Sequence, residues 1–329
     1  MPPLSPAFLI FFAATLLFGF LNGLTDSANI VAPVVSARAL SPRRTRLLAT
    51  AALCVAPFIF GVAVARTIGT NIVAPQFVTL PIVVAAALSA TGWTFFTWRA
   101  GIPSSSSHAL VGGLVGATLA GAGWPAVHPQ SITKVLVALF FSPVIGLLVG
   151  YLLTQLIYWL TRSATPRINN FFRQGQVVTA LALAFSYGAN DAQKTMGLLA
   201  LGLAAATGQP FTIPLWVIGV AIASIALGTL TGSRRMVRKL GMKFYRIRPV
   251  HGLAAQLAAA SVIFGAAFLG GPVSTTQVVS TAILGAGAAE RVNQVRWGVV
   301  GEIVWAWVLT IPATSLVSAG LFILLKQWL

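Results

Sequence analysis

Long apolar stretches recur along this chain from its beginning to its end. Many reach about 18 residues, which is enough for a helix to cross a hydrocarbon core of about 30 Å. Only 8% of the residues are charged, whereas a soluble domain carries about 25%. Inside a bilayer the backbone must satisfy its own hydrogen bonds, so spanning segments are helices or closed barrels. Because the alternating pattern of barrel strands is missing, the sequence predicts an all-α integral membrane protein.

The formal net charge of +17 suggests nucleic-acid binding as an alternative. The basic residues, however, lie between apolar stretches and do not form a soluble basic surface, so we expect no nucleic-acid partner. The first apolar stretch lacks a preceding basic segment and is longer than a signal-peptide core, so it predicts a retained membrane segment. A single cysteine, Cys54, excludes a disulfide framework.

We expect about ten transmembrane segments. They are residues 7–37, 46–66, 80–98, 105–123, 132–161, 176–206, 212–232, 251–270, 274–289 and 297–325. With the N-terminus outside, 17 of the 21 Lys and Arg residues fall in inner connections and three in outer ones. This bias toward positive inner loops predicts a multi-pass protein of the plasma (inner) membrane, in contact with the lipid bilayer, with both termini outside.

Two of these segments are too long for a single crossing. Residues 7–37 and 176–206 would each extend about 46 Å as continuous helices at 1.5 Å per residue, well beyond the hydrocarbon thickness. Each has a polar interruption near its middle, at residues 22–26 and 188–191. Irregular backbone inside a membrane is tolerated where it lines a cavity. We therefore expect two broken helices at the midplane.

The interruptions belong to an internal repeat. Residues 23–29 align with residues 188–194, and residues 101–108 align with residues 270–277, in the same order and at similar spacing. If each half crosses five times, the second half enters the membrane from the opposite face. This predicts two inverted repeats with a substrate site between them near the midplane. The expected halves are residues 1–165 and 166–329, which together form one transport domain.

The chain has four acidic residues, Asp26, Asp191, Glu290 and Glu302. Asp26 and Asp191 occupy equivalent positions of the repeats, inside apolar segments. A charge at mid-bilayer costs about 2.5–3.5 kcal/mol, so such carboxylates are candidate functional groups, with a structural ion pair or a helix cap as the simpler alternative. Since carboxylates repel anions, we assign both to a cation, either Na⁺ or the coupled proton. Glu290 is expected to be a solvated surface charge, and the role of Glu302 stays open.

Two hydroxyl runs provide an anion side. Ser104 to Ser107 and Ser274 to Thr276 each follow a proline and open an apolar segment. Hydroxyls and free backbone N–H groups at a helix N-terminus favour negative charge. Plain helix capping is the alternative for either run, but matched runs in both repeats favour anion binding.

Three further polar residues accompany these motifs. Asn29 and Lys194 occupy equivalent positions, and Lys194 is the one basic side chain inside an expected segment. Lys194 either contacts the anion or neutralises an aspartate, with structural pairing as another possibility. His108 ends the first hydroxyl run, and its simpler interpretation is a histidine that packs between helices.

These motifs resemble those of a known family. Residues 188–197, with the sequence GANDAQKTMG, look like the second-repeat signature of the inorganic phosphate transporter (PiT) family. Residues 103–110 and 272–276 resemble its paired hydroxyl motifs, and the resemblance covers essentially the whole chain. It implies symport of inorganic phosphate with Na⁺ or H⁺ by a compact prokaryotic-type member, with no other cofactor, and a homodimer.

The candidate sites follow from the motifs and the resemblance. The phosphate-binding candidates are Ser104, Ser105, Ser106, Ser107, Ser274, Thr275, Thr276, Asn29, Asn190 and Lys194. The cation-coupling candidates are Asp26, Asp191, Thr25 and Asn190, with Na⁺ held at Asp26 and Asp191. Two positions depart from the family pattern: Thr25 replaces an asparagine, and Gln277 replaces a histidine.

Other functions stay open at this point. Sulfate has the same tetrahedral shape as phosphate, so a sulfate permease of the same family is the nearest alternative. Two aspartates sharing a proton also occur in intramembrane aspartyl proteases, but the hydroxyl runs and Lys194 argue against an enzyme. A channel is a further alternative, although inverted halves suit alternating access better.

Overall fold

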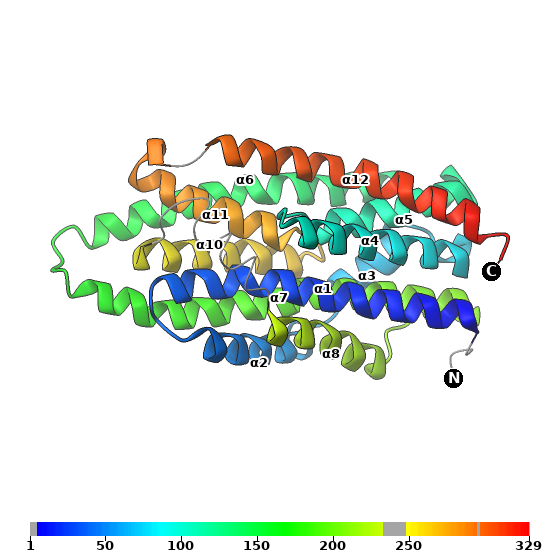
Figure 1. The fold of residues 1–329 in the computed structure, drawn as a ribbon, viewed down its shortest axis with the longest axis horizontal. Coiled ribbons are helices and arrows are strands. Elements are labelled where there is room, and N and C mark those ends of the chain that lie inside the picture. Colours follow the sequence, from blue (N-terminus) through cyan, green and yellow to red (C-terminus); the bar gives the residue numbers. More distant parts are fainter. Residues whose placement is uncertain (1–4, 233–247, 295–296, 329) are drawn as a thin grey trace.

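The computed structural model describes residues 5–232, 248–294 and 297–328, and apart from one isolated bridge between Val73 and Val127 its regular structure is helical. The principal helices are α1 (Pro6–Ser36), α2 (Pro42–Phe60), α3 (Ala63–Arg66), α4 (Leu80–Ala100), α5 (Ser106–Ala122), α6 (Pro129–Leu160), α7 (Ile168–Thr207), α8 (Leu215–Thr231), α10 (Pro249–Phe268), α11 (Thr275–Glu290) and α12 (Trp297–Leu325). They form an elongated bundle (Figure 1).

Five helices of the described residues are long and apolar enough to cross a membrane: α1, α4, α6, α10 and residues 304–325 of α12. The segments Pro42–Phe60 and Ala63–Asn71 would together make a sixth, bent by 74°. The prediction of an all-α protein is therefore confirmed, whereas ten full crossings are not.

The two halves of the chain pack in matching ways. α1 packs against α8 and α7 packs against α2, while α5 packs against α12 and α11 against α6. α1 begins and α12 ends at one end of the molecule, whereas α7 begins at the opposite end, so α1 and α7 run in opposite directions (Figure 1). Each helix of one half thus finds a partner in the other half.

Two equivalent glycines permit close helix contacts between the halves. A Cβ atom on Gly23 of α1 would lie 2.0 Å from the carbonyl oxygen of Ile225 in α8. A Cβ atom on Gly188 of α7 would lie 2.4 Å from the carbonyl oxygen of Leu53 in α2. Small residues let helix backbones approach this closely inside a membrane, so the glycines of the repeated motif serve packing between the halves.

The two hydroxyl motifs lie at the tips of two helical hairpins. Gly101 after α4 and Gly270 after α10 both take a left-handed backbone conformation, with φ of 66° and 69°, which glycine adopts without steric cost. The α4–α5 hairpin lies in the half of the molecule that contains the termini, and the α10–α11 hairpin lies in the other half (Figure 1). The tips meet, because the Ser107 hydroxyl donates to the Val273 carbonyl at 2.8 Å.

The prediction of broken helices at the midplane is wrong for both polar stretches. α1 and α7 continue without interruption through residues 22–26 and 188–191. The Thr25 hydroxyl folds back on its own helix and donates to the Leu21 carbonyl at 2.9 Å. The backbone hydrogen bonds of both helices continue through these stretches. The sharp break lies instead between α2 and α3 at Gly61, where φ is 73°.

The expectation of a solvated Glu290 is also wrong. Its carboxylate pairs with Arg248 at 2.6 Å and lies 3.4 Å from the ring of His251, and its side chain is only 16% exposed. Seven of the basic residues that we assign to inner connections lie between Arg234 and Arg248, and of these only Arg248 belongs to the part of the chain that the structure describes. The side chain of Glu302 also lies outside that part.

Candidate functional site

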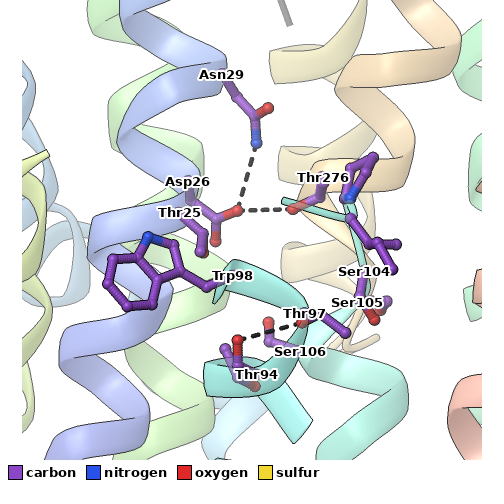
Figure 2. Close-up of a pocket in the computed structure, with 12 residues that line it drawn as sticks. Thr25, Asp26, Asn29, Thr94, Thr97, Trp98, Ser104, Ser105, Ser106 and Thr276 are labelled. Atoms are coloured by element: carbon purple, nitrogen blue, oxygen red, sulfur yellow. Dashed lines mark hydrogen bonds between the residues drawn. The ribbon is translucent and has the colours of Figure 1, made fainter. Parts of the chain in front are cut away.

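Asp26 lies in the middle of α1 and is 3% exposed. Its Oδ1 atom accepts a hydrogen bond from the Thr276 hydroxyl at 2.7 Å and another from Asn29 Nδ2 at 3.3 Å. Figure 2 shows both contacts, with Thr276 reaching Asp26 from the first turn of α11. Two donors, one from α1 and one from α11, thus hold the Asp26 carboxylate in place.

Asp191 occupies the equivalent place in α7 and is fully buried. Its Oδ1 atom forms an ion pair with Lys194, whose ammonium group also donates to the Val273 carbonyl at 2.9 Å. Of the alternatives for Lys194, the structure therefore shows the pairing with an aspartate. Its predicted contact with an anion stays a prediction.

A pocket of about 400 Å³, which includes space open to solvent, lies beside Asp26. It is lined by Thr25, Asp26, Asn29, Thr94, Thr97, Trp98, Ile102, Pro103, Ser104, Ser105, Ser106 and Thr276. Figure 2 shows how α1, the end of α4, the first hairpin tip and α11 surround it. The pocket thus collects a carboxylate, an amide and several hydroxyls from both halves of the chain.

The remaining predicted residues lie at the second hairpin tip, on α7 or, for Ser107, in the first turn of α5, and they do not line this pocket. Asn190 Nδ2 donates to the Gly271 carbonyl at 3.2 Å. Ser274 and Thr275 are buried at the start of α11. Ser107 is held away from the pocket by its bond to Val273.

Several buried oxygens around the two aspartates have no hydrogen-bond partner among the described residues. They are Asn29 Oδ1, Asn190 Oδ1, Asp191 Oδ2 and Ser274 Oγ. A buried polar atom without a partner is costly, so these oxygens are candidate ligands for a bound ion or water. Amide, hydroxyl and carboxylate oxygens are the ligands that hard cations prefer, so this donor set fits Na⁺.

Two helix N-termini provide positive electrostatic potential at the same place. α5 begins at Ser106 with Ser105 as its cap, whose hydroxyl accepts from the backbone N–H of His108 at 3.1 Å. α11 begins at Thr275, with Ser274 before it. The N-terminus of a helix attracts anions through its free N–H groups and its dipole. The arrangement can therefore hold an anion and a cation close together.

Gln193 is a residue of this region that the sequence did not single out. Its Oε1 atom accepts from the backbone N–H groups of Val64 at 2.9 Å and Ala65 at 3.2 Å. Its Nε2 atom donates to the carbonyls of Gly61 at 2.7 Å and Ala189 at 2.8 Å. Gln193 thus satisfies both sides of the break between α2 and α3. The sequence gives one indication of this role: the equivalent position of the first half is Ala28, so the amide occurs in the second half alone of the two aligned motifs.

The pocket also contains residues that sequence reasoning missed. Thr94, Thr97 and Trp98 come from the last turns of α4. In the sequence they belong to an apolar segment and carry no motif. Their proximity to Asp26 follows from the packing of α4 against α1.

The chain is similar to known proteins over almost its whole length. The model of a family described as the phosphate transporter family matches residues 22–318. A protein of Rhizobium meliloti (strain 1021), described as a probable low-affinity inorganic phosphate transporter, is 44% identical over 310 residues, which cover 93% of each chain. A protein of Bacillus subtilis (strain 168) with the same description is 38% identical over 319 residues, which cover 95% of each chain.

A solved structure has the same fold. It is entitled "The sodium-dependent phosphate transporter", and it matches with a TM-score of 0.88 over 99% of this chain and 100% of that one. The identity is 23%, so this likeness is evidence for the fold alone. The named relatives are transporters, which agrees with the prediction that the chain is not an enzyme.

Proposed function

The chain belongs to the phosphate transporter family, and from this premise we propose that it carries inorganic phosphate across a membrane in symport with a cation. The family and the long apolar helices make it a multi-pass membrane protein. One observation carries the proposal: the Asp26 carboxylate of the first half accepts the Thr276 hydroxyl of the second half beside a polar pocket.

Phosphate binds at the tips of the two hairpins in this proposal. Four residues of the hydroxyl runs, Ser104, Ser105, Ser106 and Thr276, line the pocket, and the N-termini of α5 and α11 favour an anion there. The proposed anion side is completed by Ser107, Ser274, Thr275, Asn29, Asn190 and Lys194. The ammonium group of Lys194, which is paired with Asp191, would offset part of the negative charge of the anion.

The cation binds at Asp26 and Asp191, with oxygens of Thr25 and Asn190 as further ligands. The unpartnered oxygens of Asn190 and Asp191 support this assignment within the described residues. We favour Na⁺ over H⁺, since the solved transporter of the same fold is named as sodium-dependent. No other cofactor is needed, because transport driven by an ion gradient requires only the two solutes.

The proposed architecture is a pair of inverted repeats, residues 1–165 and 166–329. The opposite directions of α1 and α7 and the matching helix contacts support it. The hairpins α4–α5 and α10–α11 occupy opposite halves of the molecule and meet at their tips, so we infer that the two tips meet inside the membrane. Alternating exposure of a site between such repeats is a common transport mechanism.

The proposal also covers the surroundings of the protein. Both termini lie at the end of the molecule opposite the connections α1–α2 and α6–α7 (Figure 1), which carry Arg38, Arg43, Arg44, Arg162 and Arg167. Positive connections face the cytoplasm, so the termini face outward across the plasma (inner) membrane. We further propose a homodimer within the lipid bilayer.

Sulfate is the second candidate substrate, because the hydroxyl motifs suit any tetrahedral oxyanion. Uptake of radiolabelled phosphate into liposomes containing the purified protein separates the two. We expect saturable uptake that unlabelled phosphate blocks and that sulfate in equal concentration does not block. Sulfate uptake without phosphate uptake would reassign the substrate, and uptake that never saturates would indicate a channel.

A further inference from the structure

His108 and Ser105 form a closed pair at the first hairpin tip. The ring Nδ1 of His108 lies 2.5 Å from the Ser105 hydroxyl oxygen, and the backbone N–H of His108 donates to the same oxygen at 3.1 Å. His108 is completely buried, and Ser105 is 1% exposed. The imidazole therefore contacts the hydroxyl of a residue that lines the pocket, although His108 does not line the pocket itself.

A second donor identifies the form of the imidazole. Gln277 of α11 places its Nε2 atom 3.4 Å from His108 Nδ1. Because the amide nitrogen of Gln277, which can only donate, faces the ring, we assign Nδ1 as the acceptor and the ring proton to Nε2. That Nε2 has no oxygen partner among the described residues, and the ring meets Phe140 at 78° with 5.4 Å between centroids. An aromatic ring can accept such an N–H weakly.

The orientation of the Ser105 hydroxyl follows. If Nδ1 is an acceptor, the hydroxyl proton of Ser105 must point to it. A hydroxyl oxygen has one proton and two lone pairs. One lone pair accepts the backbone N–H of His108, and the other stays available. Toward the pocket, Ser105 is therefore an acceptor and cannot donate.

The equivalent hydroxyl of the second half is not oriented in this way. Ser274 stands where Ser105 stands, and Gln277 stands where His108 stands. Ser274 has no side-chain capping bond, and its Oγ has no partner in the described parts of the chain. The departure of Gln277 from the family pattern thus makes the two hairpin tips chemically different, with a fixed acceptor on one and a free hydroxyl on the other.

We propose that His108 is a specificity-determining residue, which orients Ser105 as a hydrogen-bond acceptor for the protonated oxygen of phosphate. Phosphate near neutral pH keeps a P–OH group that can donate, whereas sulfate has no proton and would face the acceptor with a bare oxygen. A site with a buried acceptor rejects a ligand that leaves it unpaired. This inference rests on the proposed transport of phosphate and adds the reason for its selection over sulfate.

The test compares three variants with the wild-type protein in liposomes. The measured quantity is the ratio of the sulfate inhibition constant to the KM for phosphate. His108→Leu removes the acceptor from Nδ1 and frees Ser105 to donate, so we expect the ratio to fall about tenfold or more. His108→Asn places its Oδ1 near the position of Nδ1, so we expect it to keep the ratio within about threefold of wild type.

Ser105→Ala provides an independent variant in case the leucine variant does not fold. It removes the acceptor itself, so the ratio should fall as it does for His108→Leu. The inference is overturned if Ser105→Ala or His108→Leu keeps the wild-type ratio, or if His108→Asn falls as far as the leucine variant. Wild-type protein that transports phosphate but is inhibited equally by sulfate also overturns it and leaves the proposed function standing. Absence of phosphate uptake by the wild type defeats both.

Discussion

Thr276 of α11 donates a hydrogen bond of 2.7 Å to Asp26 of α1, across 250 positions of the chain. The two residues come from different halves, and both line the pocket proposed for phosphate. Any movement of the second hairpin relative to α1 must therefore stretch or break a bond to the proposed cation-binding carboxylate. Such a contact gives a direct route by which occupancy of one site alters the other.

Removal of this donor should weaken cation binding. Thr276→Val keeps the shape of the side chain but leaves Asp26 with one donor fewer. A hydrogen bond to a charged group contributes about 1.5–3 kcal/mol, so we expect the half-saturating Na⁺ concentration for uptake to rise about tenfold or more. Thr276→Ser retains the hydroxyl and should stay close to wild type. Equal behaviour of the two variants would contradict a role for the hydroxyl.

Breaking the buried ion pair should lower stability as well as uptake. Asp191→Asn leaves the fully buried ammonium of Lys194 without its partner. Breaking such a pair costs about 3–5 kcal/mol, so the thermal unfolding midpoint in detergent should fall clearly. Uptake should be lost because the cation loses a carboxylate ligand.

The double variant Asp191→Asn with Lys194→Met separates these two effects. It removes both charges, so no buried charge is left without a partner, which is the main cost in the single variant. We expect most of the unfolding midpoint to return while uptake stays absent. Recovery of uptake together with stability would show that Asp191 is only a structural partner of Lys194.

Gln193 should position the α2–α3 break relative to α7. Gln193→Leu has a similar volume but leaves the N–H groups of Val64 and Ala65 and the carbonyl of Gly61 without a partner. Each buried group left unpaired costs about 1–3 kcal/mol. We expect the maximal uptake rate to fall at least tenfold. Gln193→Glu can still accept from both N–H groups and should retain more activity, so equal loss in both variants would contradict this role.

Close helix packing at the repeated glycines should tolerate no side chain. A Cβ atom on Gly188 would approach the Leu53 carbonyl to 2.4 Å, and overpacking of this kind costs about 1–3 kcal/mol. Gly188→Ala should therefore lower the unfolding midpoint. Gly219→Ala in α8 is the matched control, since nothing lies within 4 Å of its added atom. A midpoint for Gly188→Ala as high as the control's would contradict the packing account.

The sequence predicted the parts of the site that stand out chemically. Asp26 and Asp191 are conspicuous because a charged carboxylate in an apolar stretch costs free energy. Their equivalent positions in the two repeats identify them as a related pair. Thr97 and Trp98 could not be found in this way, since hydroxyl and aromatic residues in an apolar segment look like packing residues. Only the contact of α4 with α1 brings them to the pocket.

The errors have physical causes of the same kind. A polar stretch in a long apolar segment looks the same in the sequence in two cases: where the helix breaks around a cavity, and where it continues and is buried by neighbouring helices. α1 and α7 are of the second kind: Asp26 finds a partner on α11, while Thr25 and Asp191 find partners on their own helices. The break at Gly61 is stabilised by Gln193, whose partners lie about 130 positions away. No local pattern reports such a contact.

Gradient-driven phosphate uptake by the wild type and by Asp26→Asn tests the central claim most directly. Both proteins are reconstituted in liposomes, and radiolabelled phosphate is followed with an inward Na⁺ gradient, with an inward H⁺ gradient and with neither. We predict that the wild type accumulates phosphate with the Na⁺ gradient alone and that Asp26→Asn accumulates none above background. Accumulation by Asp26→Asn at the wild-type level, or wild-type accumulation without any gradient, would contradict the account.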